Sequence, residues 1–164
     1  DKDNASAGFP QTGDYIIKPP EADDFERCCN EFFWVCPYVA KGIWRDELPY
    51  AMFTYERYIR DMLIKMVEWH TGIGTGFSIS AGKHGKHFKR YLEPGLWDLY
   101  VKTYSDGDYE HLWDALFTAG DLFRMLAKEV AAHFEFDYPE EDDRRVTAHL
   151  KHVRHLPRDA KTMY

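Results

Sequence analysis

The residues best suited to chemistry form a basic, glycine-broken segment at positions 80–92. Its sequence, SAGKHGKHFKRYL, contains four cations after a glycine: Lys83, Lys86, Lys89 and Arg90. A glycine turn that leads into a helix directs backbone N–H groups outward and attracts anions such as phosphate. The segment is therefore compatible with an anion contact, although its chemistry alone favours the alternative. An ordinary solvated basic helix is the alternative.

Two common phosphate-binding motifs are excluded by spacing. A Walker A loop has the pattern G-x-x-x-x-G-K-[ST] between a strand and a helix, because its amides cradle phosphates and its hydroxyl reaches magnesium. The step from Gly76 to Gly82 is one residue too long, and His84 stands where the hydroxyl belongs. The GIGTG run at 72–76 lacks the G-x-G-x-x-G spacing of a dinucleotide fold. Any phosphate contact must be of another kind.

A second candidate lies at 40–47, AKGIWRDE, where a tryptophan precedes two carboxylates. Aromatic faces and carboxylates together hold guanidinium or ammonium ligands, so Trp44, Asp46 and Glu47 are candidates for a cation site. In the structural alternative, Asp46 caps the next helix and Trp44 belongs to the core. The acidic DGDYEHLWD stretch at 106–114 is interpreted mostly as helix capping.

The histidines and cysteines do not assemble into a recognisable metal or catalytic site. His84 and His87, and the series that begins at His149, share helix faces, but nothing completes a tetrahedral set at known spacing. Cys29 and Cys36 lie on the aromatic face of a helix, which predicts buried thiols. No catalytic triad can be assembled. We therefore expect no catalytic residue and no metal ligand in this sequence.

The overall composition narrows the class of protein. The formal net charge is −7, whereas proteins that bind nucleic acid usually carry a basic footprint, so a nucleic-acid partner is not expected. No apolar run approaches the roughly 20 residues of a membrane helix. The sequence has an odd number of cysteines close together, Cys28, Cys29 and Cys36. Such a set is ill suited to disulfide bonds and indicates a reducing compartment. We expect a cytoplasmic protein without a membrane partner.

Apolar periodicity predicts an all-α fold, a bundle of five to six helices after an extended, Pro/Gly-punctuated segment at 1–22. The expected helices cover residues 23–42, 46–71, 84–93, 96–104, 108–134 and 140–156. Pro37 predicts a kink or break in the first helix, and Gly72 predicts the end of the second. In the longest helix, apolar residues alternate spacings of four and three and form a stripe that faces the core.

Taken together, these segments resemble the C-terminal half of the aminoglycoside 6-adenylyltransferases, also called streptomycin adenylyltransferases. The resemblance rests on DDFERCCNEFFWVCPYVAKGIWRDELPYA (23–51), MLIKMVEWHTGIGTGFSISAGKHGKHFKRYL (62–92), DGDYEHLWDALFTAGDLFRMLAKEVA (106–131) and RRVTAHLKHVR (144–154). DYIIKPP at 14–20 is similar to the family's entry into this region. The resemblance implies an enzyme that transfers AMP from ATP to a hydroxyl of streptomycin and so confers antibiotic resistance.

The resemblance also implies a division of the chain. In the family, an N-terminal nucleotidyltransferase domain holds Mg²⁺ and ATP with a Gly-Ser motif and paired aspartates, and this sequence has no Gly-Ser dipeptide. We therefore expect residues 1–22 to be an extended linker from a missing N-terminal domain. Residues 23–164 are expected to form the helical C-terminal substrate-binding domain, which would be inactive alone.

Site residues follow from the same resemblance. A lysine from the helical half contacts the nucleotide phosphates in related enzymes, which implies Lys83 and, next to it, Lys86. A tryptophan followed by acidic residues contacts streptomycin in relatives, which implies Trp44, Asp46 and Glu47. The partners are then the aminoglycoside, ATP and the N-terminal catalytic domain. A stand-alone helical module that binds a cation or a partner without catalysis is the alternative.

Overall fold

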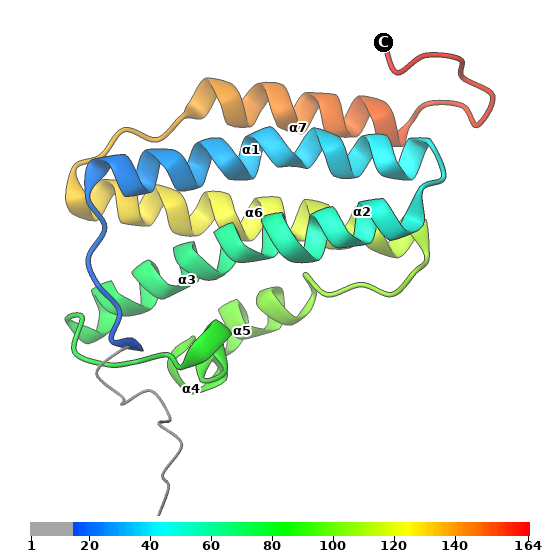
Figure 1. The fold of residues 1–164 in the computed structure, drawn as a ribbon. Coiled ribbons are helices and arrows are strands. Elements are labelled where there is room, and N and C mark those ends of the chain that lie inside the picture. Colours follow the sequence, from blue (N-terminus) through cyan, green and yellow to red (C-terminus); the bar gives the residue numbers. More distant parts are fainter. Residues whose placement is uncertain (1–14) are drawn as a thin grey trace, which may run out of the picture.

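The structure is a computed structural model that describes residues 15–164 as a bundle of helices (Figure 1). The helices are α1 (Ala22–Trp44), α2 (Leu48–Thr54), α3 (Arg60–Thr75), α4 (Phe88–Tyr91), α5 (Pro94–Val101), α6 (Tyr109–Phe134) and α7 (Glu140–Arg154). One turn of π-helix, Tyr55–Ile59, joins α2 to α3, and a 3-10 turn, Lys83–Gly85, precedes α4. The described residues form no strand, so the all-α prediction is confirmed.

Helix α1 lies between α7 and the α2–α3 run, with α6 packed alongside (Figure 1). The ring of Phe32 stacks on that of Phe123 of α6 at 3.9 Å between centroids, and Phe33 meets the same ring edge-on at 5.9 Å. The predicted apolar stripe of α6 is buried along its length. Burial of these large side chains supplies most of the driving force for the bundle.

Two helices differ from the sequence prediction. Helix α1 continues through Pro37 without a break, because Phe33, Cys36 and Val39 around it are buried and hold the helix in place despite the missing N–H. Helix α3 passes Gly72 and ends at Thr75, with Gly76 in the left-handed conformation at φ 65°.

Gly72 is required for packing instead of for termination. A Cβ at this position would lie 2.3 Å from the ring of Phe77 and 3.0 Å from Ile17. The backbone N–H of Phe77 donates to the Gly72 carbonyl at 2.8 Å. Glycine therefore lets the loop after α3 fold back against the helix.

The segment before α1 is tied to this same loop. Ile16 forms an antiparallel bridge with Ser80, and the N–H of Ile17 donates to the carbonyl of Ile79 at 3.1 Å. Ile17 is buried. Of the predicted linker at 1–22, residues 16–21 are thus non-helical and anchored, while residues 1–14 lie outside the described part.

A buried ionic network joins α6 to α7. Arg124 donates to both carboxylate oxygens of Asp143, at 2.6 and 2.7 Å, and Asp143 also accepts from the Tyr138 hydroxyl at 2.7 Å and the Thr147 hydroxyl at 3.0 Å. Asp143 is only 5% exposed. Burial alone would raise the pKa of Asp143, but these donors together hold it below its ordinary value.

A second buried network joins α3 to the loop after α5. Arg60 follows the π-helical turn, donates to the hydroxyl and carbonyl of Thr103 at 2.6 and 3.0 Å, and bonds Glu56 at 3.2 Å. Its guanidinium lies 3.9 Å from the ring centre of Tyr104. The Tyr55 hydroxyl donates to the same Thr103 carbonyl. Together these contacts fix the loop that leads into α6.

Candidate functional site

The basic segment is an irregular, exposed turn in the structure. Residues 83–85 form the 3-10 turn, and α4 spans four residues, so the continuous helix predicted from His84 is wrong. His84 and Gly85 adopt positive φ angles of 55° and 72°, which interrupt an α-helix. The anion contact stays a prediction, and it would rely on side-chain charge instead of on a helix N-terminus.

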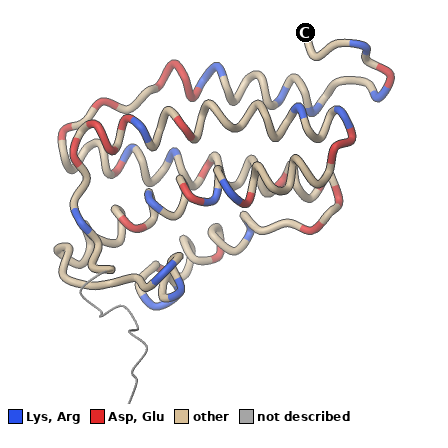
Figure 2. The backbone as a smooth tube through the Cα atoms, in the orientation of Figure 1, with Lys and Arg blue, Asp and Glu red and all other residues tan. Residues whose placement is uncertain are grey.

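The cations of this segment lie at the surface of the described part of the chain. All four cations of the segment are exposed and make no ion pair with a residue in 15–164: Lys83, Lys86, Lys89 and Arg90. Figure 2 shows the basic positions gathered around α4, below α3. The side chain of Lys86 folds over Gly82, where a Cβ would lie 2.6 Å from its Cγ. The glycine thus allows lysine to pack across the turn.

The candidate cation site at 44–47 forms the corner between α1 and α2. Trp44 ends α1 and is half-buried against the core, and Glu47 occupies the N-cap position of α2, so the alternative in which Asp46 caps this helix is wrong. Instead Asp46, at φ 57°, accepts a hydrogen bond from the Tyr109 hydroxyl at 2.7 Å. Burial and the Asp46 hydrogen bond raise the pKa of Tyr109 to about 12.

The acidic stretch that precedes α6 performs mostly structural roles. Asp108 accepts from the N–H groups of Glu110 and His111 at 2.8 and 3.2 Å, which confirms the predicted cap. Asp106 bonds the ring of His111 at 2.9 Å, and this contact raises the pKa of His111. The α1–α2 corner and the basic turn at α4 lie in different parts of the molecule (Figure 1). The structure does not bring the two predicted sites together.

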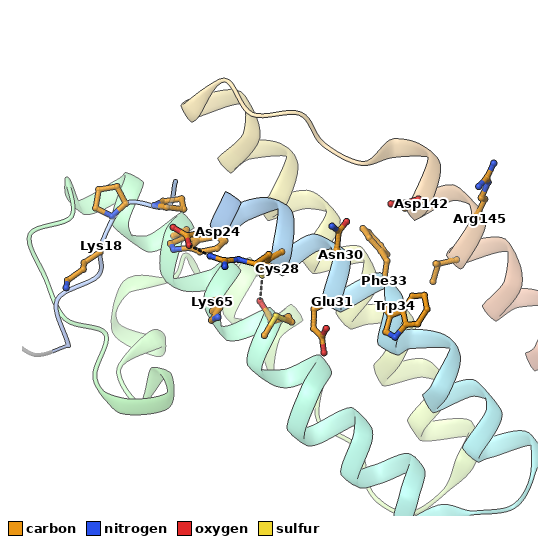
Figure 3. Close-up of a pocket in the computed structure, with 16 residues that line it drawn as sticks. Lys18, Asp24, Cys28, Asn30, Glu31, Phe33, Trp34, Lys65, Asp142 and Arg145 are labelled. Atoms are coloured by element: carbon orange, nitrogen blue, oxygen red, sulfur yellow. Dashed lines mark hydrogen bonds and ion pairs between the residues drawn. The ribbon is translucent and has the colours of Figure 1, made fainter. Parts of the chain in front are cut away.

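A broad groove that sequence reasoning missed opens over the outer face of α1, between α3 and α7 (Figure 3). Its volume is roughly 1120 Å³, which is large enough for a drug-sized ligand. Aromatic and aliphatic lining residues are Phe33, Trp34, Met62, Trp69 and Val146. Charged lining residues are Lys18, Asp24, Arg27, Glu31, Lys65, Asp142 and Arg145.

The charges in the groove are only partly paired. Asp24 binds Arg27 at 2.9 Å, and a backbone hydrogen bond from Glu21, followed by this arginine, lowers the pKa of Asp24. Arg145 pairs with Glu141 at 2.9 Å, outside the groove lining. The only sequence signal for this groove is Trp34, an indole at a position where an amphipathic helix normally carries a polar side chain.

The described residues do not fit a catalytic metal centre. Within residues 15–164, no group of three His, Cys, Asp or Glu side chains is arranged to hold a metal ion. Cys29 and Cys36 are buried as predicted, and Cys28 is buried as well. Burial raises the pKa of Cys29 to about 12 and raises those of Cys28 and Cys36 further. These cysteines are therefore poor nucleophiles. No helix in the described range is long and apolar enough to cross a membrane.

Comparison with known proteins identifies the family. The family model described as streptomycin adenylyltransferase matches residues 1–153. The chain belongs to the streptomycin adenylyltransferase family. The resemblance seen in the sequence is thereby confirmed.

Individual relatives agree with this assignment. The chain is 39% identical over 134 residues to an aminoglycoside 6-adenylyltransferase of Bacillus subtilis, covering 82% of this chain and 47% of the relative. It is 35% identical over 146 residues to the enzyme of the same name from Campylobacter jejuni, covering 88% of this chain and 51% of the relative. The chain thus spans about half the length of the curated relatives that it matches.

A solved structure also resembles this one. The crystal structure of an aminoglycoside 6-adenyltransferase from Bacillus subtilis superimposes with a TM-score of 0.79 at 35% sequence identity. The match covers 95% of this chain and 59% of the crystallised chain. The helical arrangement described above is therefore shared with a structurally characterised member of the family.

Proposed function

We propose that this chain is the helical, substrate-binding part of an enzyme that transfers AMP from ATP to a hydroxyl of an aminoglycoside such as streptomycin. Membership of the streptomycin adenylyltransferase family is the observation that carries the proposal. The names of the relatives, all aminoglycoside 6-adenylyltransferases, support the same reaction. Transfer of AMP to the drug in the cytoplasm, where ATP is available, would confer resistance.

The proposed division of labour follows from what the described helices offer. They contain no cluster of metal-binding side chains, and phosphoryl transfer requires such a cluster to bridge the phosphates. An N-terminal nucleotidyltransferase domain would therefore hold Mg²⁺ and most of the ATP. Residues 1–22 would act as the linker, and residues 23–164 would form the other wall of the cleft and be inactive alone.

Lys83 is the proposed contact to the nucleotide phosphates, with Lys86 beside it. Both side chains are exposed and make no ion pair with a residue in 15–164. An ammonium group near the triphosphate offsets negative charge as the bond to the leaving group breaks. Exposed lysines that have no carboxylate partner are suited to this role because their charge is not already neutralised.

Trp44, Asp46 and Glu47 remain the proposed contacts to the aminoglycoside at the α1–α2 corner. The Tyr109 hydroxyl donates to one oxygen of Asp46, which orients the carboxylate without neutralising its charge. The Glu47 carboxylate makes no side-chain hydrogen bond to the start of α2. Both carboxylates therefore retain capacity for the ammonium or guanidinium groups of a substrate.

The test is adenylyl transfer by the complete protein that carries this sequence. Purified protein, ATP, Mg²⁺ and streptomycin should yield pyrophosphate and an AMP-modified drug, detected by mass spectrometry. The isolated 164-residue chain should yield neither product. Transfer by the isolated chain would contradict the division of labour. Binding of streptomycin without any transfer by the complete protein would favour the stand-alone cation-binding module.

A further inference from the structure

The most exposed tryptophan of the described residues stands at the groove over α1. Trp34 is 68% exposed, whereas the other indoles are at least half-buried. Single exposed apolar side chains are common on protein surfaces and carry no argument by themselves. Trp34 differs because it lines the groove over α1 and has polar neighbours on the same helix face. Figure 3 shows the indole beside Glu31.

Glu31 and Trp34 lie on the same face of α1. They are three residues apart on α1, so their side chains lie next to each other on one face. Asn30, four residues before Trp34, lines the same groove. Tyr38, one turn further, lies 6.4 Å from Trp34 between ring centroids and extends the aromatic surface. One helix face therefore presents an aromatic plane, a carboxylate and an amide to the groove.

Glu31 has no internal role that explains its charge. Among residues 15–164 it takes part in no ion pair, although Lys65 lines the same groove. Asp24, which lies two turns before Glu31 on α1, is by contrast paired with Arg27. An anionic side chain beside an uncovered indole is the combination that attracts an organic cation, through the ring face and through charge-assisted hydrogen bonds.

We propose that Trp34 and Glu31 form a binding site for one guanidinium or ammonium group of the acceptor substrate. The cation lies over the indole of Trp34 and donates N–H hydrogen bonds to the carboxylate of Glu31. This inference rests on the proposed function, because the cation belongs to the aminoglycoside that receives AMP. It adds a specificity-determining site in the α1 groove to the α1–α2 corner predicted from the sequence.

A cation fits this part of the groove better than a nucleotide does. An adenine ring can also stack on an indole, but its phosphates would then approach the carboxylates of Glu31 and Asp142. The cations Lys18 and Lys65 come from the N-terminal segment and α3, and in Figure 3 they lie on the side of Glu31 away from Trp34. Arg145 of α7 also lines the groove but is paired with Glu141, so the carboxylate beside Trp34 on α1 is the one available to an organic cation.

The experiment is steady-state kinetics of the complete protein with streptomycin and ATP varied in turn. Loss of the cation–π contact in Trp34→Leu, or of the charge in Glu31→Gln, should raise KM for streptomycin about tenfold. KM for ATP should stay within about twofold of wild type, which is below the change expected from one lost contact. Glu26→Gln is the matched control, because Glu26 is an exposed carboxylate on α1 that does not line the groove.

The outcomes separate the inference from the proposed function. An active enzyme whose KM for streptomycin is unchanged in both Trp34→Leu and Glu31→Gln overturns the inference and leaves the proposed function intact. A rise in KM for ATP instead identifies a nucleotide in the groove and also overturns it. A wild-type protein that transfers no AMP to any aminoglycoside overturns the proposed function itself. Glu31→Gln alone decides the question if Trp34→Leu does not fold, since it keeps the shape of the side chain.

Discussion

The α6–α7 interface and the outer groove of α1 both contain arginines, carboxylates and aromatic rings, but only the interface joins them into a closed network. At the interface, every oxygen of Asp143 has a donor, from Arg124, Tyr138 or Thr147. In the groove, Glu31 and Lys65 make no ion pair with a described residue although both line it.

The difference follows from the cost of burying charge. A buried carboxylate without a partner loses several kcal/mol of solvation, so a chain that buries one must also supply its donors. A charge at the surface is solvated by water and needs no partner. Paired, buried charges therefore stabilise the structure of this molecule, whereas unpaired, exposed charges beside aromatic rings keep their capacity to bind a ligand.

The largest expected effect is on the interface. Asp143→Ala leaves Arg124 without its main partner and should lower the free energy of unfolding by about 3 kcal/mol. Guanidinium denaturation measures this loss. Glu141→Gln on the same helix is the control, because Glu141 pairs with exposed arginines and should shift the midpoint much less. Equal shifts of the midpoint in the two variants would contradict the distinction between buried, paired charges and exposed charges.

The same interface predicts how stability depends on pH. The pKa of Asp143 is lower in the folded protein than its ordinary value of 3.8, so its contribution is present above that value and is lost as pH falls through the folded pKa. Denaturation midpoints measured from pH 7 down to pH 3 should therefore decline at the acid end. In Asp143→Asn this part of the decline should be absent. An unchanged pH profile in Asp143→Asn would contradict the assignment of the acid-end decline to Asp143.

A smaller effect is expected at Glu68 on α3. Burial raises the pKa of Glu68 from 4.5 to about 6, so the folded protein binds the proton more tightly and stability falls as pH rises through this interval. Glu68→Gln should stabilise the protein by about 1 kcal/mol at pH 7.5 and by nothing at pH 4. Thermal unfolding at the two pH values measures the difference. Stabilisation that is equal at both would point to a cause other than ionisation.

The fold was largely predictable because long amphipathic stripes determine it. The spacing of apolar residues in α6 and the acidic-to-basic order of α7 each identified a helix. The ends were less predictable: α1 passes Pro37 because buried neighbours compensate for one lost hydrogen bond, and Gly72 serves close packing against Phe77. Such local signals are overridden when tertiary contacts outweigh them.

The candidate sites were less accessible from the sequence. Runs of charge located the turn at Lys83 and the corner at Trp44 because their residues are neighbours in the chain. The α1 groove combines Lys18, Lys65 and Arg145, which come from three separate segments of the chain. The spacing of residues within one segment therefore cannot predict the groove. Trp34 gave the one available hint, and only its exposed position in the fold separates it from a core tryptophan.

The most direct test of the contrast between paired and unpaired charge is at Lys83. Lys83→Gln in the complete protein should leave the denaturation midpoint unchanged, since Lys83 is exposed and forms no ion pair with a described residue. Its KM for ATP in streptomycin adenylylation should rise about tenfold, as expected for a lost contact between an ammonium and a phosphate. A folded variant with wild-type kinetics would contradict the account.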